Sequence, residues 1–144
     1  MLQAMNTGHD GSLTTIHSNS PRDTLSRVET MTLMAGFDLP IRVIREQMSS
    51  AIDLIVHLTR LRDGTRRVTH VSEVQHMEGD VVITQDIFVF DYSMGVDENG
   101  KFLGSLKSMG IRPQFADKLE DAGVKLDPDL FQVEEFSRIR AARR

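Results

Sequence analysis

A turn signal in the middle of the chain constrains its fold more than any other feature. The dipeptide Asp63-Gly64 is typical of a two-residue hairpin, because a type I′ turn needs positive φ at both central residues. Residues 54–61 before it contain several apolar and β-branched side chains, and residues 66–75 after it are predicted to form the return strand. A second turn at residues 79–80 leads into more strand. The middle of the chain is therefore predicted to consist mainly of antiparallel strands.

Helical patterns precede this region. Asn19 or Ser20 is expected to cap a helix over about residues 21–35, with Pro21 at its first position, where a missing N–H costs nothing. A second helix is expected over about residues 40–52, with its apolar side chains along one stripe.

The remaining parts complete an α/β fold. Residues 12–17 are short and rich in β-branched side chains, which predicts a buried strand before the first helix. The β-rich region is expected to span residues 54–104, and a helical segment is expected over residues 112–144. All 144 residues are interpreted as one domain, a length typical of single domains.

Composition and charge exclude several classes of protein. No apolar run approaches the roughly 18 residues of a membrane-spanning helix, so no transmembrane segment is expected. The absence of cysteine excludes disulfides and thiolate metal sites, which suits a cytoplasmic protein. The formal net charge of −4 argues against nucleic acid as the main partner.

Arginines gather around the predicted hairpin. They are Arg60, Arg62, Arg66 and Arg67. Guanidinium groups in such a cluster can clasp a phosphate or the carboxylates of a neighbouring subunit. The alternative, a hairpin tip whose charges are simply solvated, is left open by the sequence.

Two further patterns, a pair of histidines and a glycine- and lysine-containing loop, are not expected to bind a ligand. His57 and His70 would face each other across a two-residue hairpin, but zinc needs a third ligand, and neither Glu73 nor His76 has a recognisable ligand spacing, so no metal site is expected. Residues 95–101, GVDENGK, match a phosphate-binding loop in letters alone. Phe102 follows where that loop needs Ser or Thr, and no helix begins there, so a hairpin turn is predicted instead.

One motif near the start of the chain points to a family. Residues 8–21, GHDGSLTTIHSNSP, place His9 and His17 around a short Gly/Ser/Thr-rich run. This run resembles the His box of the type II/IV secretion ATPase superfamily, most closely the CpaF-type motors of Flp/Tad pilus assembly. The segments RDTLSRVETM, LMAGFDLP, IREQMSSAIDLIVHLTRLRDGTRRVTHVSEV, EGDVVITQDIFVF and GIRPQFADKLEDAGVKLDPDLF continue the resemblance along nearly the whole chain.

The resemblance implies a RecA-like P-loop ATPase domain that works as a homo-hexamer. Such motors use ATP and Mg²⁺ to power pilus assembly or secretion, and they act with platform proteins at the cytoplasmic face of the inner membrane. By position, His9, Ser12, Thr15 and His17 are implied to sense the nucleotide. The strand over residues 12–17 would then lie in the middle of the RecA-like sheet.

The resemblance begins just after the family's Walker B motif. The chain is therefore expected to be the C-terminal fragment of such a motor, with no complete catalytic set. Because phosphoryl transfer needs a phosphate cradle and Mg²⁺, no ATP hydrolysis and no bound cofactor are expected of the chain alone. Two alternatives remain open: a non-catalytic module for oligomerisation or interaction, and an inert truncated reading frame.

Overall fold

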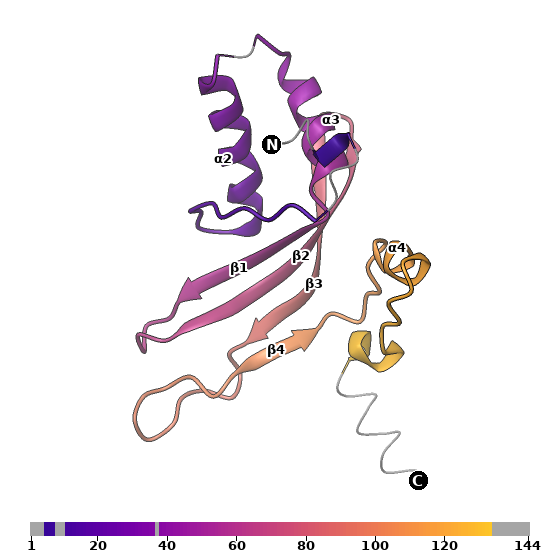
Figure 1. The fold of residues 1–144 in the computed structure, drawn as a ribbon. Helices are drawn as coiled ribbons and strands as arrows, with labels where there is room; N and C mark the ends of the chain where they lie inside the picture. The colour runs from indigo at the N-terminus through magenta and orange to yellow at the C-terminus, as the bar shows by residue number, and fades with distance from the viewer. Residues whose placement is uncertain (1–4, 8–10, 37, 134–144) are drawn as a thin grey trace. The chain divides into compact units, whose positions relative to one another are not determined.

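The computed structural model describes residues 5–7, 11–36 and 38–133, which form helices and an antiparallel sheet (Figure 1). The elements are α2 (Pro21–Met34), α3 (Ile41–Ala51), β1 (Leu54–Arg60), β2 (Arg66–Glu78), β3 (Val81–Asp91), β4 (Ser105–Ser108), α4 (Ala116–Asp121) and η1 (Pro128–Phe131). The four strands follow one another in the sheet in the order β1-β2-β3-β4. The predicted mixed α/β architecture is confirmed. The part of the predicted C-terminal helical segment after residue 133 lies outside the described residues.

The chain divides into two compact units. One unit comprises Met1–Ile55 and Ser72–Gln85, and the other comprises Val56–Val71 and Asp86–Arg144. Strands β1, β2 and β3 each contribute residues to both units.

The first unit is built on helices α2 and α3. The buried residues of α3 lie three and four positions apart, at Ile44, Met48 and Ala51, which is the spacing of one helix face. Leu25 and Val28 of α2 belong to the same apolar cluster. The cluster is completed by Ile55 and Val74. The two predicted helices are therefore confirmed, and their apolar faces form the core of this unit.

Residues 12–17 do not form the strand predicted for them. The segment from residue 11 to residue 18 is neither helix nor strand, so the predicted strand is wrong. A strand requires a neighbouring strand to take its backbone hydrogen bonds, and the described sheet consists of β1 to β4 alone. Ile16 is packed partly buried against the core cluster, whereas Leu13 is fully exposed. Local β propensity did not decide the conformation here.

The second unit contains the predicted hairpin between β1 and β2, but its turn differs from the prediction. Leu61 N–H donates to the Thr65 carbonyl at 2.8 Å, which leaves a three-residue connection instead of two. Gly64 has φ +82°, and among the described residues only glycines have positive φ, so Asp63 does not meet the type I′ requirement. A three-residue hairpin with glycine in the left-handed position fits this geometry.

The rest of the second unit extends β3. Strand β4 pairs antiparallel with it, from Phe88 opposite Ser108 to Asp91 opposite Ser105. Phe102, after the loop at residues 95–101, makes an isolated antiparallel bridge with Val96. The β-rich region therefore ends at residue 108, slightly beyond the predicted boundary.

Within the helical segment predicted for residues 112–144, the structure has the short helix α4, which ends before Gly123. The Gly123 and Val124 N–H groups donate to the carbonyls of Glu120 and Leu119 at 2.9 and 2.8 Å. Ala116 is completely buried, while Phe115 and Leu119 are half-buried. Phe131 of η1 lies against Phe88 of β3, with ring centroids 6.1 Å apart.

Candidate functional site

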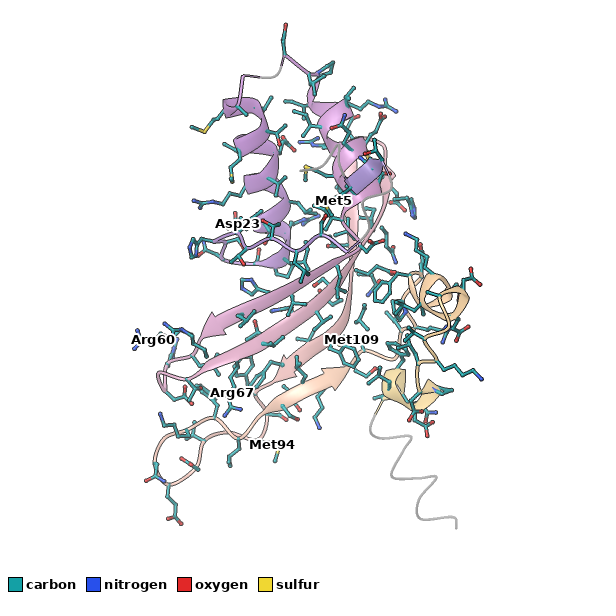
Figure 2. The ribbon with its side chains drawn as sticks, viewed as in Figure 1. Met5, Asp23, Arg60, Arg67, Met94 and Met109 are labelled. Atoms are coloured by element: carbon teal, nitrogen blue, oxygen red, sulfur yellow. The ribbon has the colours of Figure 1, made fainter. Side chains whose placement is uncertain are left out.

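The segment that carries the motif is fixed where it enters α2. The Ser20 hydroxyl accepts a hydrogen bond from Asp23 N–H at 3.1 Å, and the Asp23 carboxylate accepts from Asn19 N–H at 2.9 Å. The first bond satisfies a donor that a helix N-terminus leaves without an intrahelical partner, and the second ties the residue before the cap to the first turn. The Ser18 and Thr24 hydroxyls add a further contact at 2.6 Å. The predicted cap is confirmed at Ser20, and Figure 2 shows Asp23 in the first turn of α2.

The side chains assigned to the motif lie on the surface. Ser12, Thr15 and His17 are exposed in the extended run before α2, and His9 lies outside the described residues. Hydroxyl and imidazole groups in such a position can donate hydrogen bonds to an oxyanion. The nucleotide-sensing role of these side chains stays a prediction.

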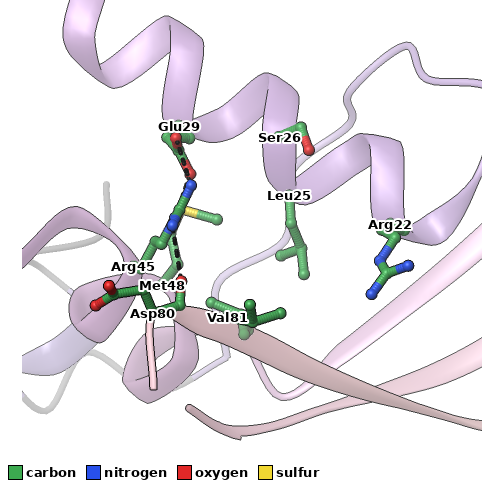
Figure 3. A pocket seen from close by; sticks show the side chains of 9 residues that line it. Arg22, Leu25, Ser26, Glu29, Arg45, Met48, Asp80 and Val81 are labelled. Carbon is green, nitrogen blue, oxygen red and sulfur yellow. Dashed lines mark hydrogen bonds and ion pairs between the residues drawn. The ribbon is translucent and has the colours of Figure 1, made fainter. Parts of the chain in front are cut away.

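A charged network that sequence reasoning missed lies in the same unit. The Arg45 guanidinium bridges α3 to α2 and to the β2–β3 turn: its Nε and Nη2 atoms donate to Glu29 at 2.8 and 3.1 Å, and its Nη1 donates to the Asp80 carbonyl at 2.7 Å (Figure 3). The hydrogen bond to Glu29 raises the pKa of Arg45. The network lines a shallow pocket together with Arg22, Leu25, Ser26, Met48, Val81 and Val82.

The residues of this network are far apart in the sequence. Glu29 and Arg45 are 16 positions apart, and Arg45 and Asp80 are 35 positions apart. The helical pattern places Arg45 outside the apolar stripe of α3, which is correct, but it carries no signal for a partner on another element. The network connects α2, α3 and the β2–β3 turn, and the Arg45 guanidinium is paired with the Glu29 carboxylate.

The four arginines of the hairpin gather at one end of the second unit. Arg60 is the last residue of β1 and Arg67 the second residue of β2, and Figure 2 shows both on the hairpin. Arg62 and Arg66 belong to the same turn region, and all four side chains are exposed. Within the described parts of the chain, none of the four has a carboxylate partner. We call this set the arginine hairpin.

The turn of the arginine hairpin is fastened to the loop between β3 and β4. Asp63 is the link: its carboxylate accepts from the Thr65 hydroxyl at 2.6 Å and from Phe102 N–H at 2.9 Å, and its carbonyl accepts from Lys101 Nζ at 2.7 Å. The hydrogen bond from the Thr65 hydroxyl is the largest of the effects that lower the pKa of Asp63 to about 2, and the Phe102 N–H contributes in the same direction.

The histidines of the hairpin do meet. The rings of His57 and His70 lie edge to face with centroids 6.0 Å apart, and His70 Nδ1 is 3.2 Å from the Thr69 hydroxyl. In the described ranges, no three His, Asp or Glu side chains gather where they could hold a metal ion. The pair is therefore a packing contact between two strands of the sheet.

The loop at residues 95–101 is the hairpin turn predicted for it. The Asp97 carboxylate accepts from Asn99 N–H at 2.9 Å and from Lys101 N–H at 2.7 Å. Val96 and Phe102 close the loop as a bridge. Its amides thus bond within the loop, and no helix follows it, so the structure excludes a phosphate-binding loop here.

Comparisons with known proteins agree with the motif. A model of the type II/IV secretion system protein family matches residues 1–89. The chain is similar to the conjugal transfer protein TrbB of Rhizobium radiobacter, with 46% identity over 79 residues, covering 55% of this chain and 22% of that protein. It is also similar to the type IV secretion system protein VirB11 of Brucella suis, with 39% identity over 70 residues, covering 46% of this chain and 19% of that protein.

The family match covers more than half of the chain, which therefore belongs to the type II/IV secretion system protein family. A Mycobacterium tuberculosis protein that also carries a conjugal transfer name is 29% identical over 106 residues, covering 74% of this chain and 29% of that protein. The chain thus spans less than a third of the length of these curated relatives. No helix among the described residues is long and apolar enough to cross a membrane.

Proposed function

We propose that the chain forms the C-terminal part of the ATPase domain of a secretion-system motor. The observation that carries this proposal is the family match over residues 1–89, which includes the motif before α2. The capped entry into α2 supports it, because it holds the end of an exposed run of hydroxyl and imidazole groups in a defined position. The relatives named for conjugal transfer and type IV secretion also support a role in moving macromolecules.

Within this family, we propose the CpaF-type motor of Flp/Tad pilus assembly as the subtype. The supporting feature is the continuation of the resemblance through GIRPQFADKLEDAGVKLDPDLF, beyond the segment that the family match covers. The proposal includes a homo-hexameric assembly at the cytoplasmic face of the inner membrane, together with the platform proteins of the pilus. The subtype is tested by deleting the gene and measuring whether the strain still forms pili.

The described residues fit ATP and Mg²⁺ only in part. Ser12, Thr15 and His17 offer donors that suit phosphate oxygens. The glycine- and lysine-containing loop at residues 95–101 directs two of its amides to Asp97 and so offers no cradle. When bound in the complete motor, ATP would supply the free energy for movement. The residues of this chain would contribute contacts to a phosphate that another segment holds.

The test compares two histidines in a restored motor. Residues 1–144 are expressed in one polypeptide behind a family segment that carries a phosphate-binding loop, or in complex with it. His17→Ala is expected to lower ATP turnover by about tenfold or more, equal to about 1.4 kcal/mol of transition-state free energy, while nucleotide affinity changes far less. The matched control is His76→Ala, which removes an exposed imidazole outside the motif.

Two results would contradict the proposal. One is wild-type turnover in the His17→Ala motor. The other is Mg²⁺-dependent ATP hydrolysis by the 144-residue chain alone, since the proposal places the phosphate-holding groups on another segment.

A further inference from the structure

The arginines of the arginine hairpin differ from Arg42, Arg45 and Arg112, which have carboxylate partners. Arg42, Arg45 and Arg112 each pair with at least one carboxylate, at 3.1, 2.8 and 2.8 Å. The four hairpin arginines are exposed and, in the part of the chain that the structure describes, make no ion pair. Like charges this close repel each other, and an anionic partner relieves that repulsion. The arginine hairpin therefore carries four guanidinium groups, without an ion pair among the described residues, around a single carboxylate, that of Asp63, whose hydrogen bonds go to Thr65 and Phe102.

The arginine hairpin is also held in place before any partner binds. Asp63, at its turn, is bonded to Lys101 and to Phe102 at 2.7 and 2.9 Å, nearly 40 positions further along the chain. A surface whose backbone is already ordered loses less conformational entropy on binding. The four guanidinium groups are thus presented from a fixed backbone.

The surroundings of the arginine hairpin favour a protein surface over a free anion. Leu58 of β1 is 61% exposed, and it lies on the same strand face as Arg60 because side chains alternate along a strand. An inorganic anion gains nothing from a neighbouring leucine, whereas a protein partner buries it. All four cations are arginine, the residue whose planar fork matches a carboxylate and which is enriched at protein interfaces.

The same unit carries a complementary surface. We call it the acidic segment, and its residues are Asp117, Glu120, Asp121, Asp127 and Asp129. Arg112 partly neutralises Glu120 and Asp117, at 2.8 and 3.5 Å. Lys118 and Lys125 are exposed in the same stretch, which is still dominated by its five acids, and the side chains of Asp121, Asp127 and Asp129 are exposed. Val124, between Asp121 and Asp127, is 49% exposed, and Leu130, directly after Asp129, is 48% exposed. The acidic segment thus combines carboxylates with apolar side chains, as the arginine hairpin combines guanidinium groups with Leu58.

We propose that the arginine hairpin of one copy of this chain binds the acidic segment of a second copy. Because the two surfaces differ, the contact is head-to-tail and leaves one arginine hairpin and one acidic segment available at the ends. Each end can accept a further copy. This interface rests on charge and apolar contact alone, so it stands whether or not the chain belongs to a motor.

The test begins with the self-association of the wild-type chain, measured by sedimentation velocity at several concentrations. Association is expected to weaken between about 0.1 M and 1 M NaCl, where the Debye length falls from about 10 Å to about 3 Å. The variant Arg66→Glu/Arg67→Glu and the variant Asp121→Arg/Asp129→Arg are each expected to raise the dissociation constant roughly tenfold or more. Circular dichroism verifies that both variants are folded.

Mixing the two charge-reversal variants separates a direct contact from a structural effect. In an equimolar mixture, the unchanged arginine hairpin of one variant meets the unchanged acidic segment of the other, and the two reversed surfaces also match. Association is therefore expected to return. The matched control is Arg22→Glu/Arg27→Glu, which reverses two exposed charges on α2 and is expected to associate like the wild-type chain.

Three results would overturn the proposal. One is unchanged association in the Arg66→Glu/Arg67→Glu variant. Another is a mixture of two folded variants that stays dissociated. The third is a wild-type chain that stays monomeric but binds phosphatidylserine vesicles through the same arginines, which would make an anionic lipid surface the partner.

Discussion

Gly104 lies where the surrounding atoms leave no room for a side chain. It is buried, and a Cβ added there would meet the Asp91 carbonyl oxygen and lie 2.6 Å from Cε1 of the Phe90 ring. Because a backbone oxygen cannot move aside as a flexible side chain can, Gly104→Ala is expected to destabilise the chain by about 1–3 kcal/mol. Urea unfolding measures the change. Ser105→Ala, at the exposed neighbouring residue, is expected to stay within about 0.5 kcal/mol of the wild-type chain.

The ionisation of Asp63 makes the folding stability of the chain depend on pH. Its pKa is lowered from 3.8 to about 2 in the folded chain, so the folded state favours the ionised carboxylate. The resulting stabilisation is fully present above about pH 4 and is lost as the pH falls through about 2. Asp63→Asn is therefore expected to show a smaller loss of stability than the wild-type chain between pH 4 and pH 2. Equal slopes would contradict this, and Glu98→Gln, which removes an exposed carboxyl from the neighbouring loop, is the control.

At the scale of elements, the start of α2 depends on one hydroxyl. Ser20 accepts the Asp23 N–H, and its removal leaves a helix donor without that partner. Ser20→Ala is expected to lower stability by about 1 kcal/mol, measured by thermal unfolding followed by circular dichroism. Ser50→Ala, on the exposed side of α3, is the matched control and should have a smaller effect.

Local sequence patterns were sufficient to predict α2, α3 and the hairpin. Where the structure differs from the prediction, contacts between residues far apart in the sequence are involved. Apolar spacing predicted α2 and α3, and the Asp63-Gly64 signal predicted the hairpin. At the turn, the Asp63 carboxylate accepts a hydrogen bond from Phe102 N–H, 39 positions away, and no local pattern contains such a contact. Residues 12–17 have the composition of a strand but form none, because a strand also needs a partner. The contact between Glu29 and Arg45 could not be predicted from local sequence patterns either. The roles of His17 and of the arginine hairpin stay predictions.

At the scale of the whole molecule, the two units share strands. Residues of β1, β2 and β3 belong to both, so the chain passes from one unit to the other within these three strands. A structure built this way is expected to unfold in one cooperative transition. The chain offers a separate probe for each unit: α2 and α3 dominate the helical signal of the first, and Tyr92 is the only tyrosine and lies in the second, with no tryptophan to obscure it.

Ile44→Ala tests this cooperativity. Ile44 is completely buried in the core of the first unit, so its truncation is expected to cost about 2–5 kcal/mol. If the shared strands couple the units, the midpoint measured by Tyr92 fluorescence should fall as far as the midpoint measured by helical circular dichroism. Leu13→Ala, at a fully exposed side chain, should shift neither midpoint appreciably. A variant that loses its helical signal early while the Tyr92 transition stays in place would show that the shared strands do not couple the two units.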